Sequence, residues 1–269
     1  MRTARTIAEL RDALTAREGA RGLVATMGAF HEGHMSLIRA AREENDVVVV
    51  SLFVNPAQFD QQSDLAAYPR DEKRDAALAE EAGVDILFAP SAEELYPRGY
   101  QTWVDVETLG SILEGRFRPG HFRGVATICL KLFNLVRPRR AYFGQKDAQQ
   151  TAVVRTLVRD LNVPVEIRVL PTVRDEDGLA LSSRNALLSP EEHRRALALP
   201  GALATRDAAK ARELLDGLEV DYLEVADFEP QVLAAAVRVG STRLIDNVVL
   251  EDVGSGLSLT RPTGEGDKT

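Results

Sequence analysis

Two histidines follow a short apolar run near the amino end of the chain, in the stretch TMGAFHEGH at residues 26–34. Imidazole nitrogens can donate hydrogen bonds to phosphate oxygens. Gly28 and Gly33 lack a Cβ, so the backbone can approach a ligand closely or adopt a positive φ. The apolar periodicity of residues 35–42 predicts a helix that opens near Gly33, with free N–H groups facing an anion. The stretch predicts a nucleotide phosphate site, although an ordinary strand–helix turn would contain the same residue types.

A lysine and three glutamines stand in the stretch FGQKDAQQ at residues 143–150. Gly144 ends a predicted strand and Lys146 opens a predicted helix, on which Lys146 and Gln150 share one face because they are four residues apart. Lys146 could then neutralise phosphate while Gln150 reads a second ligand. The alternative is a solvated helix start in which Asp147 interacts favourably with the helix dipole.

Hydroxyl and guanidinium groups are adjacent in the stretch LSSRN at residues 181–185. Ser182 and Ser183 offer hydroxyls, and the planar fork of Arg184 suits a phosphate group. A capped turn in front of an apolar pair is the alternative. A zinc site in the first stretch has little support, because His-Glu-Gly-His does not have the His-Glu-x-x-His spacing of metalloproteases.

Strand-type and helix-type segments alternate through the first two thirds of the chain. Strands are predicted at residues 23–26, 47–54, 84–88, 101–106, 141–143 and 165–170, and helices at 6–16, 35–42, 70–82, 122–136 and 147–161. Such alternation predicts right-handed βαβ units and a parallel sheet, whose ligands bind beyond the carboxyl ends of the strands. The stretches above, and Gln58 in NPAQF at residues 55–59, all fall at such ends. The predicted fold class is therefore α/β, with a Rossmann-like parallel sheet.

The pattern changes after Pro171. A turn is predicted at residues 174–178, a helix start at Ser189-Pro190 with the serine as N-cap, and strands at 222–225 and 243–250. We therefore expect two domains, a Rossmann-like nucleotide-binding domain at residues 1–174 and a smaller C-terminal α+β lid domain at 175–269. The polar tail from residue 260 is predicted to be disordered.

Bulk composition narrows the function classes. A net charge of −8 over 269 residues argues against nucleic acid as the main partner, because binding to a phosphate backbone normally requires a basic surface. No run approaches the roughly 18 apolar residues of a membrane span, and the amino terminus lacks a signal-peptide pattern, so a cytoplasmic protein is expected. The single cysteine, Cys129, lies in an apolar run and is predicted to be a core residue with a raised thiol pKa.

The stretches taken together resemble a known superfamily. His31 to His34, Lys146 and residues 182–184 resemble the HxGH and KMSKS-type motifs with which nucleotidyl-transfer enzymes bind ATP phosphates. More narrowly, six motifs over residues 26–188 resemble the pantothenate synthetase (pantoate–β-alanine ligase) family: TMGAFHEGH, SLFVNPAQF, YPR, GHFRGVATI, FGQKDAQQ and VRDEDGLALSSRN. Members of that family condense pantoate with β-alanine, using ATP and Mg²⁺, through an enzyme-bound pantoyl adenylate, and they form homodimers.

The resemblance implies a role for each matching position. The phosphate-binding positions of the family fall on His34, Lys146, Ser182, Ser183 and Arg184. His31 matches a histidine near the reacting phosphate, so that the catalytic set comprises His31, His34, Lys146 and Arg184. The rest of the nucleotide pocket falls on Met27, on Gly144 and Asp147 at the ribose, and on Val173 and Leu181 near adenine. The amides that hold pantoate fall on Gln58 and Gln150. Which residues bind Mg²⁺ is not given by the resemblance.

Three departures from the family pattern are visible. Leu181 stands where methionine is common, Phe30 replaces a usual leucine, and the stretch 189–222 looks shorter than in most members. Two other functions stay open: a nucleotidyltransferase that stops at an adenylyl or cytidylyl product, and a non-catalytic nucleotide-sensing module. The pairing of Gln58 with Gln150 favours the ligase, because a bare nucleotide binder does not need a second polar pocket.

Overall fold

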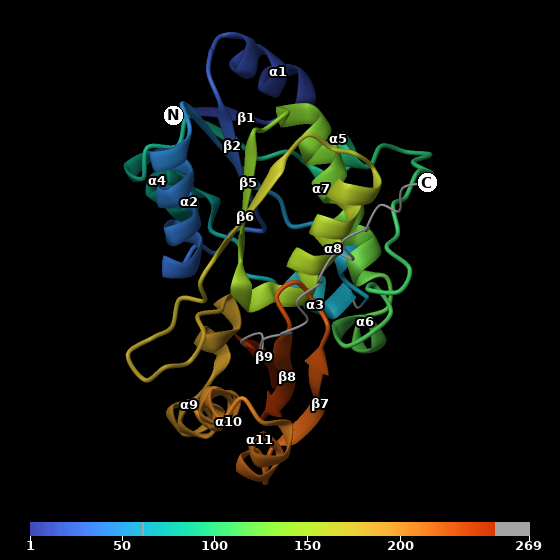
Figure 1. Ribbon diagram of the computed structural model, residues 1–269. Helices are drawn as coiled ribbons and strands as arrows, with labels where there is room; N and C mark the ends of the chain where they lie inside the picture. The colour runs from blue at the N-terminus through green and yellow to red at the C-terminus, as the bar shows by residue number, and fades with distance from the viewer. Residues whose placement is uncertain (61, 251–269) are drawn as a thin grey trace, which may run out of the picture.

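Six parallel strands form the larger of two sheets in the computed structural model, which describes residues 1–60 and 62–250 (Figure 1). The strands are β1 (Arg2–Ala4), β2 (Arg21–Thr26), β3 (Val47–Leu52), β4 (Ile86–Phe88), β5 (Arg140–Gly144) and β6 (Glu166–Leu170). Their order is β1-β4-β3-β2-β5-β6. After β2, the chain adds β3 and then β4 on one side of that strand. It then crosses over and adds β5 and β6 on the other side. This reversal opens a crevice beyond the carboxyl ends of β2 and β5.

Helices cover both faces of this sheet (Figure 1). On one face lie α2 (Glu32–Glu44) and α4 (Glu72–Glu81), and on the other lie α1 (Ile7–Thr15), α7 (His121–Val136) and α8 (Ala148–Asp160). Along β3, Val47 and Val49 pack into the core on the α7 side, whereas Val48 and Val50 pack into the core on the α2 side. A strand buried on both faces must be apolar throughout, which accounts for the unbroken valine run.

The larger unit and the segment after it also contain several short elements. They are the helices α3 (Gln62–Ala67), α5 (Ala92–Leu95) and α6 (Glu114–Phe117) and the 3₁₀ turns η1 (Pro56–Gln58), η2 (Gln145–Asp147) and η3 (Ser183–Leu187). Because η1 follows β3 and η2 follows β5, both turns lie at the carboxyl edge of the sheet.

A second sheet is built from the C-terminal part of the described chain (Figure 1). Its antiparallel strands are β7 (Glu219–Ala226), β8 (Val232–Val239) and β9 (Thr242–Val249), in that order. One face packs on the helices α9 (Pro190–Ala196), α10 (Ala198–Ala204) and α11 (Ala208–Leu214). The other face forms an apolar cluster with Leu113 and Ala148 of the larger unit. The predicted fold class, a Rossmann-like parallel sheet with a smaller α+β unit, is confirmed.

Most of the predicted elements are present with small shifts at their ends. Ser189 caps α9 in a capping box with Glu192, as the sequence predicts. Cys129 is 4% exposed, and burial raises the pKa of its thiol to about 12, in agreement with a core role. Among the described residues, no helix combines the length and the apolar character needed to cross a membrane. The predicted disorder from residue 260 falls outside the described residues.

The strand predicted at residues 101–106 is wrong. This segment has no strand neighbour among the described residues, and its alternating pattern instead reflects packing along α7. Val104 and Val106 contact the core, and the Val104 amide donates to the Thr127 hydroxyl of α7 at 3.0 Å. Trp103 stacks on Tyr96 with ring centroids 5.8 Å apart.

Two strands were not predicted from the sequence. β1 is only 3 residues long and pairs with β4, far from it in the chain. β8 contains three consecutive alanines, which carry no strand signal of their own. It forms because its side chains alternate between two apolar clusters, with Leu233 and Val237 facing the helices and Val232 and Ala234 facing the larger unit.

Candidate active site

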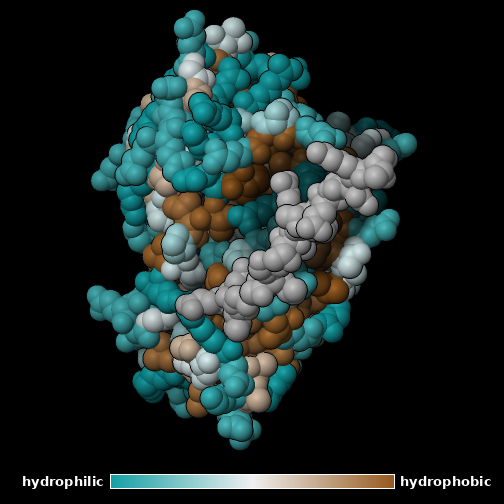
Figure 2. Space-filling view, in the orientation of Figure 1, coloured by the Kyte–Doolittle hydropathy of each residue, from teal (hydrophilic) through white to brown (hydrophobic). Residues whose placement is uncertain are grey.

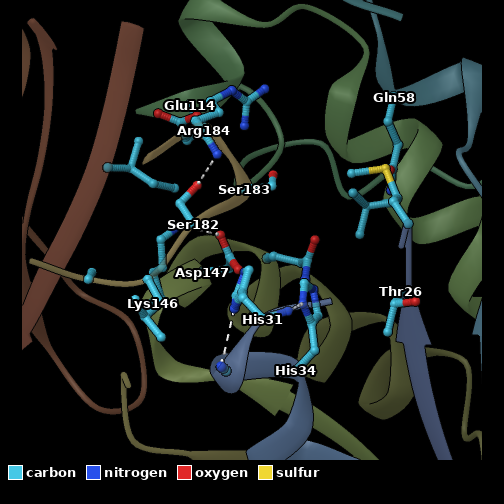
Figure 3. A pocket seen from close by; sticks show the side chains of 18 of the residues that line it. Thr26, His31, His34, Gln58, Glu114, Lys146, Asp147, Ser182, Ser183 and Arg184 are labelled. Atoms are coloured by element: carbon cyan, nitrogen blue, oxygen red, sulfur yellow. Dashed lines mark hydrogen bonds and ion pairs between the residues drawn. The ribbon is translucent and has the colours of Figure 1, made fainter. Parts of the chain in front are cut away.

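The histidine stretch occupies the corner where β2 ends and α2 begins. His31 is the N-cap of α2, with an extended backbone, and its Nδ1 accepts a hydrogen bond from the Gly33 amide at 3.2 Å. The His34 Nδ1 in turn accepts from the His31 amide at 3.4 Å. A Cβ on Gly33 would lie 2.9 Å from the His31 ring, so glycine is required here for a close approach. The two imidazoles lie side by side, with ring centroids 4.1 Å apart (Figure 3).

These contacts fix the protonation of both rings. Since each Nδ1 accepts a backbone hydrogen bond, the neutral ring carries its proton on Nε2. Burial, followed by the charge of His31, lowers the pKa of His34 to about 3, and burial together with the charge of Lys146 lowers the pKa of His31. The pair therefore presents two neutral N–H donors near pH 7 in the ligand-free protein.

A buried carboxylate from another helix holds the turn that precedes the histidines. Gly28 has a φ of 87° and Ala29 a φ of 53°, a region in which a residue with a Cβ is strained. Asp75 of α4 is 1% exposed and accepts hydrogen bonds from the amides of Ala29 and Phe30, each at 2.8 Å. Asp75 thus fixes the strained turn, a role that sequence reasoning missed.

The lysine stretch leaves β5 through the 3₁₀ turn η2 before α8 begins at Ala148. The prediction that Lys146 and Gln150 share one face of a continuous α-helix is wrong at Lys146, because that residue lies in the 3₁₀ turn. Both side chains nevertheless line the same cleft. The Lys146 Nζ lies 3.7 Å from the Asp147 carboxylate and retains 19% side-chain exposure.

The serine–arginine stretch forms the turn η3 across the cleft from the histidines (Figure 3). The Ser182 hydroxyl caps this turn by accepting from the Arg184 amide at 3.2 Å. The Arg184 guanidinium is 36% exposed, and its ion-pair contact with Asp64 is long, at 3.7 Å. Arg184 is therefore a cation that is not tightly neutralised.

The Gln58 side of the cleft is built by η1 and α7. Gly124 of α7 lies so close to η1 that a Cβ there would approach the Ala57 carbonyl oxygen to 2.3 Å. The Gln58 carbonyl is contacted by His121 Nδ1 at 3.0 Å and accepts from an Arg118 Nη at 3.3 Å. Gln58 is 7% exposed. These contacts explain why the GHFRG motif and Gln58 occur together in the sequence.

All the residues predicted from the sequence line one cleft of about 530 Å³ between the two sheets. Figure 2 shows a hollow near the middle of this face, bordered by hydrophobic residues, and Figure 3 shows the donor side chains around its interior. The predicted residues in its lining are Met27, His31, His34, Gln58, Gly144, Lys146, Asp147, Gln150, Val173, Leu181, Ser182, Ser183 and Arg184.

Other cleft residues received no role from the sequence. They include Asp64, Tyr68, Glu114, Arg118 and His121. Tyr68 belongs to the YPR motif and His121 to the GHFRG motif, so both lay within recognisable stretches. Burial, together with the charge of Arg118, lowers the pKa of His121 to about 4.

A divalent cation fits this cleft only in company with phosphate. Among the described residues, no group of three or more His, Cys, Asp or Glu side chains could hold a metal by itself. The carboxylates of Asp147 and Asp64 line the cleft. Mg²⁺ is commonly held by one or two carboxylates together with substrate phosphates, so the donor set suits an ion that arrives with a nucleotide.

The crevice beyond the carboxyl ends of β2 and β5 has paired imidazoles on one side and Lys146 and Arg184 on the other. These features define a Rossmann-like α/β protein with a ligand site rich in hydrogen-bond donors. The family model described as pantoate-beta-alanine ligase matches residues 2–249. The pantothenate synthetase of Moorella thermoacetica is 53% identical over 256 residues, which covers 86% of this chain and 90% of that protein. The chain belongs to the pantoate–β-alanine ligase family.

Solved structures agree with this assignment. The pantothenate synthetase from Thermus thermophilus has a TM-score of 0.88 and 47% identity, over 93% of this chain and 99% of that chain. The pantoate-β-alanine ligase from Francisella tularensis, in a complex described as containing β-γ ATP and β-alanine, has a TM-score of 0.83 and 35% identity. That alignment covers 93% of this chain and 97% of the Francisella chain.

Proposed function

We propose that this chain condenses pantoate with β-alanine, converting ATP to AMP and pyrophosphate through a pantoyl-adenylate intermediate. One observation carries the proposal: the phosphate-type donors and the two glutamines Gln58 and Gln150 line the same cleft. A family model over residues 2–249 and a relative at 53% identity support it.

In the first step, a pantoate carboxylate oxygen attacks the α-phosphorus of ATP, and the bond to pyrophosphate breaks. Two anions must approach each other, so the site has to supply positive charge and hydrogen-bond donors. Lys146 and Arg184 supply the charge, while the His31 and His34 Nε2–H groups act as donors that need no reorganisation. Mg²⁺, carried by the ATP phosphates, would supply further charge neutralisation.

In the second step, the β-alanine amine attacks the acyl carbon of the adenylate, and AMP leaves. This step depends on orientation and on exclusion of water, which would otherwise hydrolyse the adenylate. Gln58 and Gln150 hold the pantoyl hydroxyls and carbonyl through their amides. Met27, Gly144, Asp147, Val173, Leu181, Ser182 and Ser183 complete the nucleotide pocket.

The test is a pyrophosphate-exchange assay. Exchange of labelled pyrophosphate into ATP should require pantoate and proceed without β-alanine, and AMP should be the final nucleotide product. Exchange in the absence of any carboxylic acid would favour a nucleotidyltransferase, ADP as product would contradict the adenylate mechanism, and binding without turnover would indicate a sensing module.

We also propose that the chain acts as a cytoplasmic homodimer, with residues 175–269 as a second domain that closes over residues 1–174 and shields the adenylate from water. Sedimentation of the purified protein should give twice the monomer mass. Small-angle scattering should show a smaller radius of gyration with ATP and pantoate together than with neither. An unchanged radius would contradict closure, and a monomer mass would contradict the dimer.

A further inference from the structure

A buried asparagine of the small sheet is joined to the turn that carries Lys146. Asn247 lies on β9 and is 4% exposed. Its Nδ2 donates to the backbone carbonyls of Gln145 and Lys146, each at 2.9 Å, and its Oδ1 accepts from the Gln145 Nε2 at 3.0 Å. One side chain thus makes three hydrogen bonds to two consecutive residues of η2, about 100 positions earlier in the chain.

Asn247 is itself held in place by its neighbour. The Asp246 Oδ1 accepts from the Asn247 amide at 2.8 Å. Asp246 is 2% exposed, and its carboxylate accepts from both Nη atoms of Arg174 at 2.6 and 3.2 Å. Arg174 follows Val173 and forms an isolated β-bridge with Ala180, next to Leu181. Two adjacent residues of β9 are therefore attached to both the lysine turn and the segment predicted to face adenine.

The lysine turn needs such external support. Gly144, at its N-cap, has no side chain with which to cap the turn. Within the described residues, the Lys146 ammonium has only a long contact with Asp147, at 3.7 Å. The place from which Lys146 reaches into the cleft is therefore set by its backbone, and the carbonyl of Lys146 itself is one of the groups that Asn247 binds.

We propose that Asn247 is a positioning residue for Lys146: its amide sets the turn from which the ammonium reaches the transferring phosphate. The proposal rests on the proposed function. Removal of the amide frees the turn, and a misplacement of about 1 Å at a reacting group costs on the order of a hundredfold in rate. The rate of adenylate formation should fall, whereas pantoate binding should change less, because Gln58 lies on η1, which Asn247 does not contact.

A double-mutant cycle tests whether Asn247 acts through Lys146. Pantoate-dependent pyrophosphate exchange is measured for wild type, Asn247→Ala, Lys146→Ala and the double variant. We expect Asn247→Ala to lower kcat at least tenfold in the wild-type background, and less than twofold when Lys146 is already absent. A purely structural role would lower kcat by the same factor in both backgrounds, and that result, or no loss at all, would overturn the proposal.

Two further variants separate the three hydrogen bonds and keep the test decisive if Asn247→Ala does not fold. Asn247→Asp keeps the shape and the acceptor but loses both donations to the turn, so it should behave like Asn247→Ala. Gln145→Ala removes only the bond to Oδ1 and should lose less activity than Asn247→Asp. The opposite order would contradict the assigned role.

Asn45 offers a matched control. It is a buried asparagine, 8% exposed, whose Nδ2 donates to the Ala41 carbonyl and to the Tyr142 hydroxyl. Asn45→Ala should lower thermal stability but leave the kcat of pyrophosphate exchange within about twofold of wild type. Absence of exchange in the wild-type protein would contradict the proposed function itself, whereas normal wild-type exchange with an additive cycle would contradict only the role of Asn247.

Discussion

The two sides of the cleft are built differently. The histidine side is fixed from within the large sheet, because His31 and His34 cap each other at the start of α2 and Asp75 clamps the turn before them. The opposite side carries Lys146 and Arg184 on short 3₁₀ turns, and η2 is held from outside by β9 of the small sheet.

The two sides of the cleft also differ in charge. Burial keeps the histidines neutral, so the fixed side supplies donors of constant geometry. The opposite side supplies full charges on long side chains, whose nearest carboxylates lie 3.7 Å away. A reaction between two anions can use both: preset donors to orient the phosphates, and lightly paired cations to neutralise the charge that develops.

The largest effect is expected on the cationic side. Lys146→Ala should lower the rate of pantoate-dependent pyrophosphate exchange by 10²–10³, the usual order for one lost donor to a developing charge. The fold should survive, because the Lys146 ammonium makes no ion pair shorter than 3.7 Å in the part of the chain that the structure describes. Stopped-flow or exchange kinetics, with thermal unfolding as the control for folding, would measure this. Near-normal turnover would show that Lys146 is a polar residue of the η2 turn with no catalytic role.

On the fixed side, the clamp should matter for both stability and rate. Asp75→Ala leaves the buried amides of Ala29 and Phe30 without an acceptor, at about 1–3 kcal/mol of unfolding free energy each. Exchange activity should fall as well, since the strained turn that places His31 would relax. Asp75→Asn keeps one acceptor oxygen and should lose less. Urea unfolding of the three proteins tests this order. Equal stability of Asp75→Ala and wild type would show that Asp75 does not stabilise the turn.

The glutamine pocket distinguishes the substrate from the nucleotide. Gln58→Ala or Gln150→Ala should weaken pantoate binding by about 1–3 kcal/mol, because ligand hydroxyls lose their partners. Gln→Glu should weaken it more, because a carboxylate would face an anionic substrate. ATP affinity should barely change. Calorimetric titration of the Glu variants with pantoate and with ATP measures both, and an equal loss of ATP affinity would show that the pocket is misassigned.

At neutral pH, the smallest effect concerns the neutral histidines. An unfolded imidazole takes up a proton near pH 6.5, whereas folding lowers the pKa of His34 to about 3. The unfolded chain binds more protons within this window, so the unfolding free energy should fall as pH drops from about 6.5 toward 3, by at most about 1.4 kcal/mol per pH unit for each such group.

His34→Gln should remove part of this pH dependence, which urea unfolding at several pH values would show. His121, whose pKa is also lowered, to about 4, should account for a further part. Asn45→Ala is again the control, since its stability deficit should stay constant across the window. A His34→Gln profile parallel to that of wild type would mean that His34 is not held neutral by burial.

Local sequence was sufficient for most elements. The valine run of β3, the Ser189-Pro190 start of α9 and the positive φ of Gly28 each follow from residue types and their immediate neighbours. The residues that line the cleft could be named as well, because their stretches follow strand ends and resemble known motifs. These signals depend on residues close together in the chain, and such local conformational preferences can be recognised in a single sequence.

Tertiary structure decided what depends on distant partners. Residues 101–106 have the alternation of a strand but pack on α7 instead, and the alanines of β8 form a strand because two apolar layers cover them. The neighbouring positions of β2 and β5, which bring the histidines and Lys146 to one crevice, depend on the order of strands in the sheet.

The chemistry of the site was decided in the same way. Local sequence identifies an imidazole, an ammonium and a carboxylate, but the environment determines their charge and geometry. His34 is neutral because folding removes it from water, the turn before it is fixed by Asp75 more than 40 residues away, and the Lys146 turn is bound by Asn247 about 100 residues away. The sequence therefore determined which chemical groups the site contains. Their protonation states and positions followed from burial and hydrogen bonds that exist only in the folded chain.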